Sequence, residues 1–70
     1  MPLLMAQQGA ELVINRVNAR NDDMHRHLES LGLVPGSAVT IVSKNASGII
    51  INVKESRVAL SRELASKVFV

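Results

Sequence analysis

The sequence predicts a mainly β domain, a small SH3-like β-barrel with one inserted helix at about residues 21–31 and a short C-terminal helical turn. Strand-like runs recur about every ten residues with tight turns between them, which is typical of a small barrel. One amphipathic helical segment follows the first strand. The length of 70 residues favours a single domain over residues 1–70 and excludes large catalytic folds of ~200 residues or more.

The first 18 residues predict a helical turn and then a strand. Residues 2–8 are rich in apolar side chains and stop at Gly9, so we expect one helical turn against the core. Residues 11–18 read as a strand that carries apolar side chains on both faces. These are Leu12 and Ile14 on one face, and Val13 and Val17 on the other. This pattern indicates partial burial on both sides.

Residues 21–31 form the clearest helix of the sequence. Asn21 is a suitable N-cap, and the acidic residues 22–23 follow it where the helix dipole favours anions. The apolar residues repeat at i, i+4 and i+7 and form one stripe: Met24, Leu28 and Leu31. Gly32 and Leu33 then match the C′ and C″ positions of a Schellman ending.

The second half reads as short strands joined by tight connections. Turns are expected at residues 34–36 and 54–56, and a hairpin loop at 45–48. Ser61 is a suitable cap for a single helical turn over residues 62–66. The predicted strands are residues 38–43, 49–53, 57–60 and 68–70.

Composition excludes several classes of function. Without cysteine there is no disulfide framework and no thiolate nucleophile or ligand, which suits a reducing cytoplasm. Phe69 is the only aromatic residue, so no base-stacking platform exists, and the net charge of +2 comes from scattered residues. We therefore expect no nucleic-acid partner. No apolar run approaches ~18 residues and no secretory signal is seen, so we expect a cytoplasmic chain without direct membrane insertion.

Catalytic motifs are missing. The serines fall mostly at turns and caps, where hydroxyl groups bond to the backbone. The four glycines stand singly, which leaves no phosphate-binding loop. We expect no catalytic residue, no cofactor-binding residue and no GTP hydrolysis by this chain.

The first helix holds the only cluster with metal chemistry. Asp23 and His27 are spaced i, i+4, and so are His25 and Glu29 on a different face. Each pair supplies two ligands where a closed site needs four, so a tight site requires ligands from elsewhere or from a second copy in a homodimer. Asp23, His25 and His27 are therefore weak candidates for Fe²⁺ or Zn²⁺, and a metal-binding or metal-sensing domain is the alternative function. The simpler interpretation is a solvated helix face.

Residues 28–36 read LESLGLVPG and resemble the "RL-x-x-LGL-x-PG" signature of the ferrous-iron transport protein A (FeoA) family. The opening residues 2–11 and the closing residues 58–70 are also similar to that family, so the resemblance covers essentially the whole chain. It implies a small cytoplasmic accessory protein that acts on FeoB, a membrane transporter with a GTP-hydrolysing domain that imports Fe²⁺. The sequence departs from the family pattern at His27, usually arginine, at Gln8, often proline, and at Glu55, often glycine. If that turn needs a positive φ, Glu55 costs ~1 kcal/mol.

The connector after the first helix is the predicted partner surface. Leu33, Val34 and Pro35 lie there between two glycines, and a stiff apolar segment loses little entropy on docking. The competing interpretation is that Leu33 packs against the helix that it ends.

Overall fold

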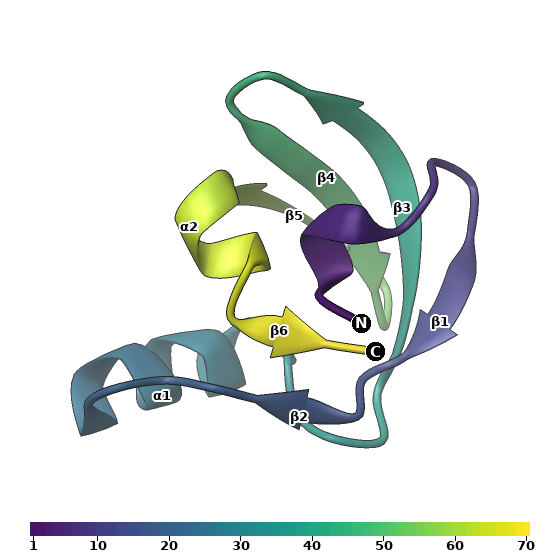
Figure 1. Ribbon diagram of the computed structural model, residues 1–70. Coiled ribbons are helices and arrows are strands. Elements are labelled where there is room, and N and C mark those ends of the chain that lie inside the picture. Colours follow the sequence, from purple (N-terminus) through teal and green to yellow (C-terminus); the bar gives the residue numbers. More distant parts are fainter.

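Six strands form two separate sheets in the computed structural model, which describes residues 1–70 (Figure 1). The larger sheet is antiparallel with the order β1-β3-β4-β5, and the smaller sheet pairs β2 with β6. The mainly β architecture of the sequence prediction is confirmed. However, β5 is an edge strand, so no continuous ladder closes the larger sheet. The strands are β1 (Glu11–Val13), β2 (Arg16–Val17), β3 (Ala38–Asn45), β4 (Gly48–Val53), β5 (Ser56–Ser61) and β6 (Val68–Phe69).

The helices begin where the sequence predicts them. They are the 3₁₀ helix η1 (Leu3–Met5), the inserted helix α1 (Asp22–Ser30) and the short helix α2 (Arg62–Ala65). The side chain of Asn21 accepts a hydrogen bond from the Met24 N–H at 2.8 Å, and that of Ser61 accepts one from the Leu64 N–H at 3.2 Å. Both predicted N-caps are thus confirmed, and α1 projects from the sheets at the lower left of Figure 1.

The single strand predicted for residues 11–18 is wrong, because the chain turns a corner inside it. β1 ends at Val13 and pairs with β3, whereas β2 begins at Arg16 and pairs with β6. At the corner, Ile14 is buried and its N–H donates to the Ser37 carbonyl at 2.9 Å. One straight strand cannot serve two sheets, so the apolar residues on both faces of this segment reflect a change of sheet.

The two hairpins of the larger sheet are tight. In the first, the Asn45 side-chain oxygen accepts hydrogen bonds from the N–H groups of Ser47 and Gly48 at 2.7 and 3.1 Å. Gly48 allows a close approach of β5, since a Cβ at this position would collide with the Leu60 carbonyl oxygen. The second hairpin, β4–β5, turns within two residues, because Val53 pairs with Ser56.

The β4–β5 turn corrects the expectation about Glu55. The residue with the left-handed backbone is Lys54, with φ of 57°, and Glu55 does not share it. The strain expected for a non-glycine residue in this conformation, roughly 1–2 kcal/mol, therefore falls on the lysine.

The core lies between the larger sheet and the elements that cover its inner face. In Figure 1, η1, α2 and β6 lie on one side of the curved sheet. The predicted stripe of α1 takes part: Leu28 is buried, while Met24 and Leu31 pack partly buried against the core. The fully buried side chains include Leu3, Ile14, Leu28, Leu33, Val39, Ile41, Ile49, Ile51, Val53 and Val68.

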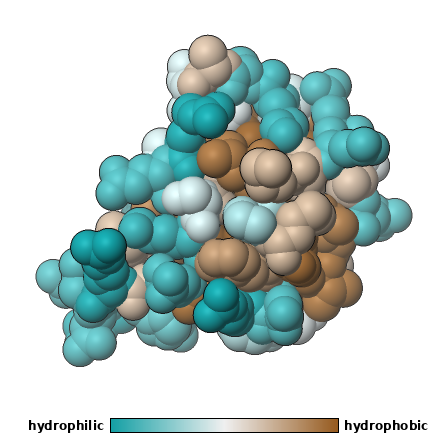
Figure 2. All heavy atoms as spheres, in the orientation of Figure 1, coloured by the Kyte–Doolittle hydropathy of each residue, from teal (hydrophilic) through white to brown (hydrophobic).

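The two ends of the chain lie side by side. The Met1 carbonyl accepts a hydrogen bond from the Val70 N–H at 2.8 Å, and Pro2 forms an isolated bridge with Phe69. Figure 2 shows apolar side chains gathered near these ends and β1, whereas the region of α1 is hydrophilic. None of the helices has the length and apolar character needed to span a bilayer.

Candidate partner-binding surface

The connector between α1 and β3 is held by backbone hydrogen bonds at both ends. The Gly32 N–H donates to the Glu29 carbonyl at 2.9 Å and the Leu33 N–H to the Leu28 carbonyl at 3.0 Å. These are the two bonds of a Schellman motif, and Gly32 adopts its left-handed position with φ of 88°. At the far end, the Gly36 N–H donates to the Ile14 carbonyl at 2.8 Å. The predicted helix stop is therefore confirmed, and the connector is fixed at both ends.

Leu33 does not belong to the surface of this connector. Its side chain is 1% exposed and lies in the core, as the competing interpretation of a helix-stop contact requires. A partner cannot reach it without unfolding the helix end, so its assignment to a partner surface is wrong. Val34 is half-buried and Pro35 is exposed, so only these two of the predicted residues present atoms to the solvent.

The β4–β5 turn lies next to the connector, a neighbour that sequence reasoning missed. A Cβ built on Gly32 would lie 3.4 Å from the Val53 side chain and 3.9 Å from the aliphatic stem of Lys54. The strained lysine and the apolar connector thus occupy one end of the molecule. No local pattern reveals this, because the two segments are about 20 residues apart and meet only through the pairing of β3 with β4.

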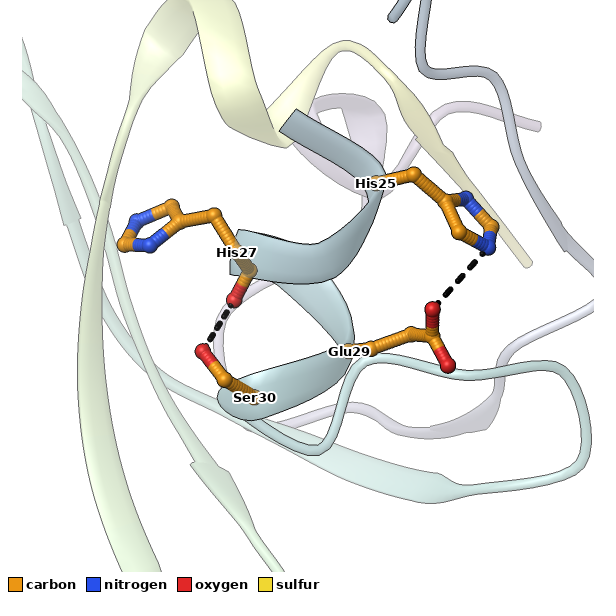
Figure 3. Close-up of polar contacts among 4 residues, drawn as sticks. All are labelled: His25, His27, Glu29 and Ser30. Carbon is orange, nitrogen blue, oxygen red and sulfur yellow. Dashed lines mark hydrogen bonds and ion pairs between the residues drawn. The ribbon is translucent and has the colours of Figure 1, made fainter. Parts of the chain in front are cut away.

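The candidate metal ligands of α1 do not gather into one cluster. The His25 Nε2 atom lies 3.3 Å from the Glu29 carboxylate, and both side chains are about half exposed. His27 points to the opposite side of the helix (Figure 3), and its backbone carbonyl accepts a hydrogen bond from the Ser30 hydroxyl at 2.6 Å. Asp23 forms no ion pair with His27. Nowhere do three or more histidine, aspartate or glutamate side chains gather as metal ligands.

The core of the molecule contains no polar or charged side chain. All of its buried side chains are apolar, and no buried side-chain nitrogen or oxygen lacks a hydrogen-bond partner. The charged side chains lie at the surface, among them Arg16, which stacks over the Phe69 ring at 4.4 Å from its centroid. Fold and surface together therefore define a small SH3-like domain with an apolar core and with its charged side chains at the surface.

Comparison with known proteins identifies the particular family. The FeoA domain model matches residues 1–70, so the chain belongs to the FeoA family. A protein of Methanocaldococcus jannaschii, provisionally named Fe(2+) transport protein A, is 33% identical over 69 residues, which cover 99% of this chain and 83% of that protein.

Solved structures of FeoA proteins share the fold. An iron uptake regulatory protein (FeoA) has a TM-score of 0.88 at 28% identity, with 97% of this chain and 91% of that chain covered. The FeoA of Stenotrophomonas maltophilia, solved with zinc and described as a prokaryotic SH3 domain protein, has a TM-score of 0.84 at 29% identity. The match covers 97% of this chain and 86% of that one. The SH3-like fold that the sequence predicts is confirmed by these neighbours.

Proposed function

We propose that this chain is a cytoplasmic accessory protein of ferrous iron uptake that acts by binding an FeoB-type GTPase transporter in the membrane. The observation that carries the proposal is membership of the FeoA family over residues 1–70, since the family is linked to Fe²⁺ transport. The chain would contribute contacts to the transporter and no catalysis of its own.

The contact surface that we propose is the exposed part of the connector, Val34 and Pro35. The hydrogen bonds at both of its ends restrict its motion before binding, so docking would cost little further conformational entropy. The nearby Lys54 would add a charge beside the apolar contact. Binding of iron or zinc by α1 would be weak, because a pair of protein ligands leaves half of a tetrahedral coordination shell to water.

The experiment measures binding of the purified chain to the purified FeoB-type transporter. We expect Val34→Asp to weaken binding by about 10–100-fold, because a carboxylate in an apolar contact is desolvated without a partner. Val34 is only half-buried, so the variant should stay folded, as thermal unfolding would verify. Pro35→Asp, at an exposed position, is a second variant with a smaller risk to the fold.

Met5→Asp is the matched control, because it adds the same charge to an exposed apolar residue on η1. Unchanged binding by folded Val34→Asp and Pro35→Asp would refute the surface but leave the partnership intact. If the wild-type chain fails to bind the transporter, the proposed function itself is refuted.

A further inference from the structure

The outer face of the larger sheet carries one continuous row of polar residues across all four strands. Glu11 on β1 pairs with Thr40 on β3, Thr40 pairs with Asn52 on β4, and Asn52 pairs with Arg57 on β5. We call these four residues the polar row. A carboxylate thus stands at one end of the row and a guanidinium group at the other, with two short neutral side chains between them.

The polar row is accessible. Glu11, Asn52 and Arg57 are exposed and Thr40 is half-buried. A shallow hollow of about 350 Å³ runs over the row and is lined by Glu11, Thr40, Asn52 and Lys54, among others. The only hydrogen bond between side chains of the row joins Arg57 Nε to Asn52 Oδ1 at 3.3 Å. A guanidinium group has five N–H donors, so Arg57 keeps most of its capacity for another acceptor.

We propose that this face binds a second copy of the chain, with the two polar rows opposed across a twofold axis that runs along the strands between β3 and β4. This operation places Glu11 of each copy opposite Arg57 of the other, and Thr40 opposite Asn52. Every charge of the row then meets its opposite, which is the self-complementarity that an isologous dimer requires. The proposal is independent of the transporter partnership.

The lengths of the side chains fit this arrangement. The sheet curves around η1, so its outer face is convex, and two convex faces come closest at their centres (Figure 1). The short side chains Thr40 and Asn52 lie at the centre of the row, and the long side chains Glu11 and Arg57 lie at its ends, where the faces diverge. Facing sheets are ~10 Å apart, a gap that a glutamate and an arginine span together.

Apolar residues flank the row along the strands and add area. Val13 and Ala38, an opposed pair, lie on one side, and Ile50 and Ala59 lie on the other. The patch measures about 14 Å in each direction, roughly 200 Å² per copy, from strand spacing and rise. A standard interface buries ~800 Å² per partner, so we expect a weak dimer in rapid exchange.

The test is a charge-swap experiment read by sedimentation velocity over a range of protein concentrations at low salt. The wild-type chain should self-associate at sub-millimolar to millimolar concentrations, and increased salt should weaken it. Glu11→Arg alone and Arg57→Glu alone should each lower the association at least tenfold, because each opposes like charges. An equimolar mixture of the two variants should regain it, since the arginine introduced at position 11 faces the glutamate introduced at position 57 of the other chain.

Glu63→Arg and Arg62→Glu are matched controls on α2, with the same changes in net charge at exposed positions away from the row. We expect both to associate as the wild type does. The proposal is overturned if the wild-type chain stays monomeric at 1 mM and low salt, which would leave the face open to a different partner. It is also overturned if the mixture fails to regain association, or if the controls lose it to the same degree.

Discussion

At the scale of single residues, the backbone conformation of a position, and not its residue type, decides where strain falls. The β4–β5 turn shows this, because sequence reasoning assigned its strain to Glu55 whereas the positive φ belongs to Lys54. A turn of two residues offers two positions, and the family pattern alone does not say which one needs the left-handed backbone. The pairing of Val53 with Ser56 sets the turn and thereby the conformation of the lysine.

Glycine substitutions separate the two positions of this turn. We expect Lys54→Gly to leave the free energy of unfolding unchanged or to raise it by up to about 1.5 kcal/mol, because relief of roughly 1–2 kcal/mol of strain offsets or exceeds the entropy cost of glycine, roughly 0.5–1 kcal/mol. Glu55→Gly brings the entropy cost without relief and should lose about 0.5–1 kcal/mol. Urea denaturation of both variants measures the order, and a Lys54→Gly variant less stable than Glu55→Gly would contradict the assignment.

At the scale of the elements, local signals determined the helices but not the first strand. The signals that begin and end the helices lie within a few residues of them, so the sequence predicts the helix ends well. They are the N-caps Asn21 and Ser61 and the stop at Gly32. The break at Ile14 arises because the segments on either side of it pair in different sheets. β1 pairs with residues 38–40, and β2 pairs with residues 68–69. Such long-range pairing leaves no local mark beyond apolar residues on both faces.

The two histidines of α1, His25 and His27, point to opposite sides of the helix (Figure 3), and this geometry predicts weak metal binding. His25 and Glu29 form one pair, whereas His27 points to the opposite side (Figure 3). We expect calorimetric titration of the purified chain with Zn²⁺ or Fe²⁺ to give no site tighter than about 10 µM, because two protein ligands leave half of a tetrahedral shell to water. A sub-micromolar site that His25→Ala or His27→Ala removes would contradict this expectation.

At the scale of the whole molecule, the sequence predicted the fold but only part of the candidate surface. Strand spacing, turns and one amphipathic helix were enough for an SH3-like domain, and the comparisons confirm it. The connector was found from its glycines, although Leu33 faces inward because the Schellman motif turns it towards the core. The polar row could not be predicted, since it depends on a register that shifts between Ile41 and Ser43 in β3.

The central claim is that the chain supports ferrous iron uptake through contact with a transporter and not through a metal site of its own. Its most direct test is ⁵⁵Fe²⁺ uptake by host cells that lack the chain, supplied with the wild type, with Val34→Asp, or with the double variant His25→Ala/His27→Ala at equal protein levels. We predict that the wild type and the double variant restore uptake and that Val34→Asp restores little of it, because only Val34 lies on the proposed contact surface. Full uptake with Val34→Asp together with none from the histidine variant would contradict the account and favour a metal-binding function.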